Sequence, residues 1–205
     1  MKVAVFASGK GSNVRALLDA VSQGKVPRTH IVLVLSNNSA AGALAIARER
    51  GIAAVHLSRM QFESDGRYES ALSDCLRSHG ANFIALAGYM KKIPNSIVRD
   101  FKNRIINIHP ALLPAFGGEG MYGARVHEAV IASGARVSGA TVHLVDEEYD
   151  RGSVVLQREV PVLPGDSSDT LAKRVLAVEH EIYPEALRLF AEDRVRIENG
   201  RVSIS

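Results

Sequence analysis

Short apolar runs alternate with helical patterns through the first half of the chain. The apolar runs cover residues 3–7, 31–35, 54–57 and 83–87, and the helical patterns cover residues 14–21, 43–50 and 68–79. Continuous apolar strands that alternate with helices are typical of a parallel sheet covered on both faces. We therefore predict an α/β fold, with a mainly parallel twisted sheet of Rossmann type and helices on both of its faces.

The second half follows a different pattern. Residues 138–145 and 154–162 form two longer strand patterns in direct succession, which favours an antiparallel pair toward the C-terminal part. Residues 168–192 form a long amphipathic helical pattern, in which we expect Thr170 to face inward and Pro184 to kink or split the helix. Asn199-Gly200 predicts a final hairpin.

Length and composition narrow the class of protein. A chain of 205 residues with 46% hydrophobic residues suits one domain, which we divide into halves of about 1–100 and 101–205. The formal charge is only +3 and the chain has no long run of basic residues, so we expect no nucleic-acid partner. Cys75 is the one cysteine, which excludes an internal disulfide. No segment has the roughly 20 apolar residues of a membrane span, and we expect a cytoplasmic protein with no membrane partner.

A glycine loop, Ser8-Gly9-Lys10-Gly11-Ser12-Asn13, joins the first strand to the first helix. A helix N-terminus offers free N–H groups and the positive end of a dipole to an anion. The loop is neither Gly-x-Gly-x-x-Gly nor an ATP-binding P-loop, so a single phosphate group is a better ligand than a dinucleotide. The plainer alternative is that Ser12 or Asn13 only caps the helix.

Asn107 and His109 lie two residues apart in an apolar strand pattern, and residues at that spacing share a face. Pro110 then ends the strand because it has no N–H. A polar pair in such a strand is costly unless a ligand or a reaction uses it. The segment 117–123 follows with four glycines, which indicates a mobile loop beside this pair.

His143 in a later strand and Asp150 in the loop after it complete a candidate site. Asn, His and Asp together supply an oxyanion donor, an acid/base and an orienting carboxylate, a set that suits acyl transfer or hydrolysis. A carboxylate near an imidazole favours its protonated form. The plainer alternatives are that His143 is a core residue and that Asp150 shapes a turn. The other histidines lack the spacing of a metal site.

Several motifs in sequence order resemble the folate-dependent formyltransferases, and among them the phosphoribosylglycinamide formyltransferase (GAR transformylase) group. The motifs are SGKGSN at 8–13, LSNN at 35–38, LAGYMKKI at 86–93, NIHPALLP at 107–114, VHLVDEEYDRGSVVLQ at 142–157 and EHEIYP at 179–184. The NIHPALLP motif with a distal Asp-x-Gly is typical of the whole family, and SGKGSN points to the GAR enzyme.

The resemblance implies a role for each matching residue. Asn107 would polarise the formyl oxygen, His109 would be the general acid, and Asp150 would bond to His109 and raise its pKa. The substrate residues would be Gly11, Ser12 and Asn13 for the phosphate and Glu179 for the ribose; the folate residues would be Met90, Lys91, Lys92, Ile93 and Asn107. The substrates would be glycinamide ribonucleotide and 10-formyltetrahydrofolate, with no metal and no permanently bound cofactor, in a monomer or a homodimer. His143 matches a family histidine whose role is less sharply assigned.

Two departures from the family pattern accompany this resemblance. The arginine expected just after a Phe-x-Ser is displaced to Arg67, which we keep as a possible site residue, and the loop 117–123 is longer than in the family. The alternatives are another folate-dependent formyltransferase, a formyltetrahydrofolate hydrolase of the same fold, or a nucleotide-binding sensor without chemistry. A methionyl-tRNA formyltransferase would need a further C-terminal domain and a deformylase a further N-terminal one, so we expect neither.

Overall fold

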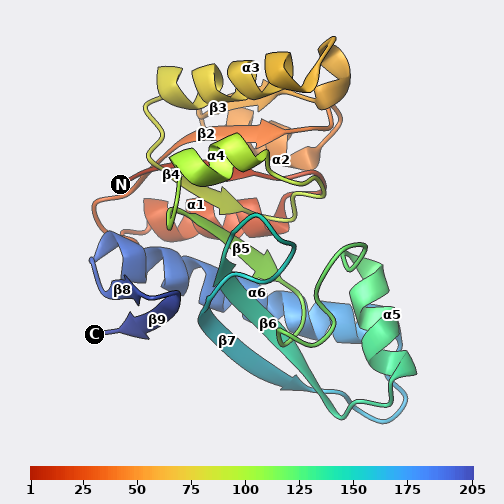
Figure 1. Ribbon diagram of the computed structural model, residues 1–205. Coiled ribbons are helices and arrows are strands. Elements are labelled where there is room, and N and C mark those ends of the chain that lie inside the picture. Colours follow the sequence, from red (N-terminus) through yellow and green to blue (C-terminus); the bar gives the residue numbers. More distant parts are fainter. The chain divides into compact units, whose positions relative to one another are not determined.

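In the computed structural model, which describes residues 1–205, hydrogen-bonded strands follow the order β3-β2-β1-β4-β5-β6-β7 (Figure 1). The strands are β1 (Lys2–Phe6), β2 (His30–Ser36), β3 (Ala53–His56), β4 (Phe83–Leu86), β5 (Ile105–His109), β6 (Val137–Leu144) and β7 (Val154–Pro161). β1 is parallel to β2 and β4, β2 is parallel to β3, and β6 and β7 are antiparallel. The predicted α/β class is confirmed, with its parallel strands and its antiparallel pair toward the C-terminus.

The chain divides into two compact units, residues 1–106 and residues 107–205, and each is described by itself. One domain with a phosphate-binding half at about 1–100 and a folate and catalytic half at about 101–205 stays a prediction.

In the first unit, helices cover the parallel strands on both faces. They are α1 (Ser12–Ser22), α2 (Gly42–Glu49), α3 (Asp65–Ser78) and α4 (Asn95–Asp100), with a 3-10 turn, η1 (Arg59–Gln61). Right-handed crossovers from β1 toward β3 place α1 and α2 on one face, and the return through β4 places α3 and α4 on the other (Figure 1). The centre of the core is β1, whose residues from Val3 to Phe6 are fully buried.

The strand order reverses direction between β1 and β4, and this is the topological switch point of the sheet. Ligands of open α/β sheets bind beyond the carboxyl ends of the strands at such a point. The glycine loop at 8–13 and the loop at 88–94 follow the two strands that flank it. Both belong to the first unit, so the fold of that unit alone brings them together.

The plainer alternative, in which Ser12 or Asn13 only caps α1, does not hold. The N-cap residue is Gly11, and no side-chain hydrogen bond caps this helix. Gly11 has a φ of 83°, and a Cβ there would lie 2.7 Å from the Cα of Ala43. The close approach of α2 therefore requires glycine, and glycine brings no side chain to the start of α1.

In the second unit, α6 (Ser168–Ala191) packs on β6 and β7, with α5 (Ala124–Ala132) beside it. The strands β8 (Val195–Glu198) and β9 (Arg201–Ile204) form the predicted hairpin. Asn199 and Gly200 both have positive φ, as a type I′ turn requires.

For α6, the expectation that Thr170 faces inward is wrong, and of the two outcomes expected at Pro184 the split is excluded. The helix is continuous over 24 residues and is not split at Pro184. Its apolar face is buried on both sides of the proline, at Ile182 and Leu187, and this burial outweighs the lost backbone hydrogen bond. Thr170 is exposed and takes part in a capping box with Ser167 at the start of the helix.

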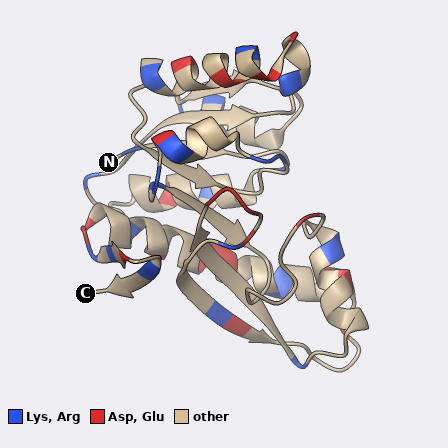
Figure 2. Ribbon diagram, in the orientation of Figure 1, with Lys and Arg blue, Asp and Glu red and all other residues tan.

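Residues of both charges are interspersed along the chain, and α3 carries both kinds (Figure 2). No helix combines the length and the apolar character that crossing a membrane would require.

Candidate active site

The structure brings Asn107, His109, His143 and Asp150 together within the second unit. Asn107 Nδ2 lies 3.0 Å from His143 Nε2, and His109 Nδ1 lies 3.6 Å from Asp150 Oδ2. The other carboxylate oxygen, Oδ1, lies 3.5 Å from His143 Nε2. Both histidines are almost fully buried, so these groups interact in a poorly solvated environment.

Backbone contacts determine which way the Asn107 amide points. His143 Nδ1 lies 2.8 Å from the Leu144 carbonyl oxygen, which only accepts, so Nδ1 carries the proton. In a neutral imidazole, Nε2 then accepts from the Asn107 amide nitrogen. The second N–H of that amide stays available for a ligand, which is the arrangement an oxyanion donor requires.

His109 has an acceptor next to each ring nitrogen. Nε2 donates to the Phe116 carbonyl oxygen at 2.9 Å, and Nδ1 faces the Asp150 carboxylate. Burial lowers the pKa of His109 below its ordinary value, although Asp150 and the Phe116 carbonyl act to raise it. Asp150 thus acts in the expected direction, but desolvation is the larger effect and the net shift is downward.

Asp150 also holds the glycine-rich segment 117–123. Its Oδ2 accepts from the Gly118 N–H at 2.9 Å. Burial opposes ionisation of Asp150, but its contacts with His143 and Gly118 and the charge of His109 keep its pKa below the ordinary value. Asp150 is therefore an anion that lies beside both histidines and holds the loop through Gly118.

Two glycines permit the close packing around this carboxylate. A Cβ on Gly117 would lie 2.4 Å from Leu113 Cδ2 and 3.2 Å from Asp150 Cβ. A Cβ on Gly152 would lie 1.8 Å from the Leu144 carbonyl oxygen. The Asp-x-Gly motif therefore has a steric basis, because only glycine lets the chain after Asp150 pass so close to β6.

The segment after β5 is fixed by a buried hydroxyl. Thr141 Oγ1 donates to the Ala111 carbonyl at 2.6 Å and accepts from the Leu113 N–H at 3.1 Å. Gln157 Nε2 donates to this hydroxyl at 2.9 Å and to the Leu113 carbonyl at 3.0 Å. The turn that leaves the site is therefore anchored on β6 and β7.

The first unit holds the candidate phosphate and folate loops. α1 has no acidic residue in its first turn, which leaves its positive dipole end uncompensated. In the loop after β4, Met90 is half exposed and Lys91 and Lys92 are exposed, whereas the Ile93 side chain is buried. Ile93 can therefore meet a ligand through its backbone but not through its side chain.

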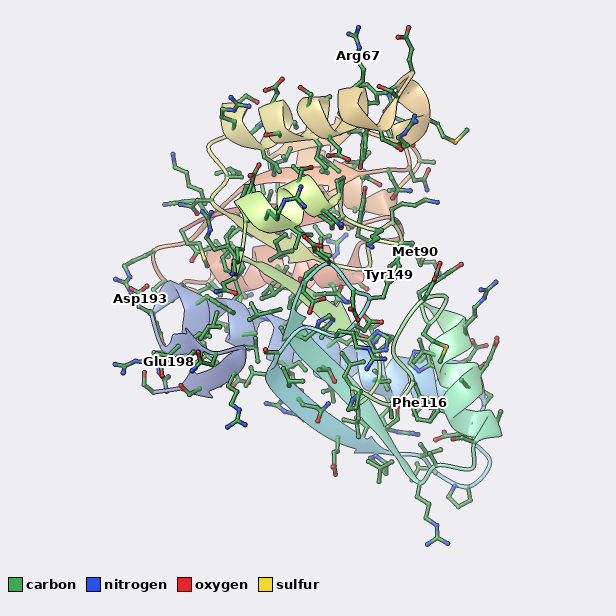
Figure 3. All side chains as sticks on the ribbon, in the orientation of Figure 1. Arg67, Met90, Phe116, Tyr149, Asp193 and Glu198 are labelled. Atoms are coloured by element: carbon green, nitrogen blue, oxygen red, sulfur yellow. The ribbon has the colours of Figure 1, made fainter.

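The remaining candidates lie on helices. Glu179 is buried on α6, where its charge adds to the effect of burial in raising the pKa of Tyr183. Arg67 is exposed in the first turn of α3 and extends outward from the helix (Figure 3).

Sequence reasoning missed several groups at the site. The Phe116 carbonyl and the Gly118 N–H are backbone atoms, which carry no residue-type signal. His127 on α5 is buried, and burial, with a smaller contribution from the charge of His109, lowers its pKa. Thr141 had a usable signal, since a hydroxyl in the apolar run of β6 requires buried partners.

Comparison with known proteins agrees with this geometry. The family model described as "Formyl transferase" matches residues 1–187. The chain is 47% identical over 196 residues to "Phosphoribosylglycinamide formyltransferase, chloroplastic" of Arabidopsis thaliana, covering 95% of this chain and 67% of that protein. It is 36% identical over 199 residues to the phosphoribosylglycinamide formyltransferase of Haemophilus influenzae, covering 97% of this chain and 91% of that protein.

A solved structure shares the whole fold. The crystal structure of glycinamide ribonucleotide transformylase 1 from Symbiobacterium toebii superposes with a TM-score of 0.93 at 40% identity, covering 100% of this chain and 93% of that one. The family model, the relatives and the fold agree, and this chain belongs to the formyl transferase family.

Proposed function

We propose that this protein is a phosphoribosylglycinamide formyltransferase of purine biosynthesis. It transfers the formyl group of 10-formyltetrahydrofolate to the amine of glycinamide ribonucleotide, giving formylglycinamide ribonucleotide and tetrahydrofolate. The observation that carries the proposal is the buried pairing of Asn107 with His143 beside that of His109 with Asp150.

In the first step the substrate amine attacks the formyl carbon, and the formyl oxygen becomes an oxyanion. The N–H of Asn107 that does not bond to His143 donates to this oxygen, whose charge grows in the transition state. His143 acts as a positioning residue, since it holds the amide nitrogen rather than the amide oxygen toward the site.

In the second step the bond from the formyl carbon to N10 breaks as N10 gains a proton. His109 supplies this proton as a general acid, and the proton that the attacking amine loses returns His109 to its protonated form. We assign the transfer to Nε2, because Nδ1 faces Asp150. Nε2 donates to the Phe116 carbonyl in the free protein and must exchange that partner for the substrate.

Other residues bind the two substrates in this proposal. The start of α1, at Gly11, Ser12 and Asn13, receives the phosphate, and the lack of a side-chain cap and of an acidic residue in the first turn supports this role. Glu179 accepts from the ribose hydroxyls. The folate residues are Met90, Lys91, Lys92, Ile93 and Asn107. Arg67 stays a possible phosphate contact, although its outward direction does not favour it.

The proposal also covers partners and location. 10-Formyltetrahydrofolate is a co-substrate rather than a permanently bound cofactor, and the protein acts as a monomer or homodimer without nucleic-acid or membrane partners. We propose a cytoplasmic location for this chain; the Arabidopsis relative is named as chloroplastic.

The test is release of tetrahydrofolate, followed by absorbance, with and without glycinamide ribonucleotide. Wild-type protein should turn over only with the ribonucleotide, and His109→Ala should lose most of the rate while His30→Ala, at an exposed histidine, should not. Equal rates without the ribonucleotide would favour the hydrolase alternative. Absence of any turnover by folded wild-type protein would refute formyl transfer.

A further inference from the structure

Ser8 connects the ends of three parallel strands at the switch point of the first unit. Its N–H donates to the Gly88 carbonyl at 3.0 Å, and its Oγ accepts from the Met90 N–H at 2.8 Å. The same Oγ donates to Asn37 Oδ1 through a short hydrogen bond, and the Ser8 carbonyl accepts from Asn38 Nδ2 at 3.4 Å. Ser8, the second residue after β1, is therefore hydrogen-bonded to residues that follow β2 and β4.

The direction of these bonds follows from what each atom can do. The amide oxygen of Asn37 only accepts, so it takes the single hydroxyl proton of Ser8. The lone pairs of the hydroxyl then receive the Met90 N–H. Donor-to-acceptor chains of this kind strengthen one another, and no apolar side chain at position 8 can replace the hydroxyl.

The loop after β4 is held on two sides. The Tyr89 ring packs edge-on against Phe6 with centroids 5.4 Å apart, and its hydroxyl lies 3.3 Å from that of Tyr68. On the other side, Met90 is held through its N–H by Ser8. The backbone is therefore held at Met90, immediately before the exposed residues of the loop. The Met90 N–H already donates a hydrogen bond within the protein.

We propose that Ser8 is a positioning residue for the folate loop, defined as Gly88–Ile93. It acts through Met90 and Asn37 and touches neither substrate, so its role differs from that of the phosphate-binding residues three to five positions later. The assignment of folate to this loop rests on the proposed function. The hydrogen-bond chain itself does not.

The kinetic expectation is selective. Loss of one hydrogen bond that orders a binding loop should raise the KM for 10-formyltetrahydrofolate about fivefold to tenfold in Ser8→Ala. The KM for glycinamide ribonucleotide should change less than about twofold, because the helix N-terminus is left intact. Ser8→Thr keeps the hydroxyl and should restore the folate KM. Ser133→Ala is the matched control, since Ser133 also donates to and accepts from backbone groups, but in the turn after α5.

Hydrogen exchange at the Met90 amide, measured in the free protein, tests the chain of bonds without any activity. Ser8→Ala should speed this exchange about tenfold, and Asn37→Ala should also speed it. Combining the two changes should add little, since both break the same chain. An exchange rate unchanged in Ser8→Ala would overturn the proposal.

The two measurements separate the possible failures. If exchange responds to Ser8→Ala but wild-type protein transfers no formyl group, the proposed function fails and the positioning of the loop stands. If wild-type protein turns over and exchange responds, but both KM values rise equally, Ser8 is a general structural residue and the folate role is overturned.

Discussion

Asp150→Asn isolates the charge of Asp150 from its other contacts. The amide has nearly the same shape as the carboxylate, and its oxygen can still accept from the Gly118 N–H that anchors the loop. The change therefore removes the anion beside His109 and leaves the loop attached. Asp150→Ala removes both, so the difference between the two variants measures the contribution of the loop contact.

The distance between the charges sets the magnitude. At an effective dielectric constant of about 20, unit charges 3.6 Å apart attract by about 4.6 kcal/mol, or about three pKa units. Carboxylates this close usually shift a neighbour by about 1–3 units. Burial already lowers the pKa of His109, so removing the carboxylate should lower this pKa by about a further 1–3 units.

This shift has a defined sign in the pH–rate profile. A general acid works when protonated, so above its pKa the rate falls tenfold for each unit by which that pKa drops. Asp150→Asn should lower kcat at pH 7.5 by about 10- to 1000-fold. The alkaline fall of the pH–rate profile should move to lower pH by about the same 1–3 units. At sufficiently low pH the rate should return toward that of the wild type.

The assay is initial-rate tetrahydrofolate release at saturating substrates from about pH 5 to pH 9, with NMR titration of the His109 ring as the direct measurement. Calorimetric binding of glycinamide ribonucleotide should stay within about twofold of wild type, because the phosphate-binding residues are untouched. Loss of rate with no shift of the profile would refute the electrostatic role. Normal turnover with a large loss of binding would contradict the placement of Asp150 in the reaction.

Three further outcomes follow from the packing and the titration of the molecule. Gly152→Ala places a methyl carbon 1.8 Å from a backbone oxygen and should cost about 1–3 kcal/mol in urea unfolding, whereas Gly66→Ala, which meets open space, should not destabilise. Thr141→Val orphans two buried backbone groups and should lower stability by about 2–4 kcal/mol, with Thr141→Ser near wild type. Burial lowers the pKa of His127 and His180, so the unfolded chain binds more protons. Stability should therefore fall as pH drops through and below about 6.5, by at most about 1.4 kcal/mol per pH unit for each histidine. Urea midpoints that stay constant between pH 8 and pH 5.5 would contradict the last prediction.

The elements of the sheet could be predicted because burial on both faces leaves a continuous apolar run. β1 and β4 show this signal, and both were found within about a residue of their bounds. α4 was missed because six residues between a loop and a strand are too few for a helical period to stand out. The N-cap of α1 at Gly11 was not predictable for another reason, since the approach of α2 to Gly11 is a tertiary contact that local residue preferences do not encode.

Prediction of the candidate site succeeded where a polar residue interrupts an apolar pattern. Asn107 and His109 stood out for this reason, and their strand spacing put them on one face. The net direction of the His109 pKa was not predictable, because it depends on how burial balances against a carboxylate that arrives from a loop 41 positions later. His109 contacts the Phe116 carbonyl and Asp150 contacts the Gly118 N–H, and both partners are backbone atoms, which residue type does not encode.

The Asp-x-Gly motif acts on both pairs of the site, His109 with Asp150 and Asn107 with His143, through different residues. Asp150 supplies the carboxylate that faces His109. Gly152, two residues later, lets the chain close on the Leu144 carbonyl, and the same carbonyl accepts from His143 and so selects the tautomer that orients the Asn107 amide. A substitution at the glycine would therefore disturb the oxyanion donor as well as the position of the carboxylate, although glycine itself has no group that could take part in the reaction.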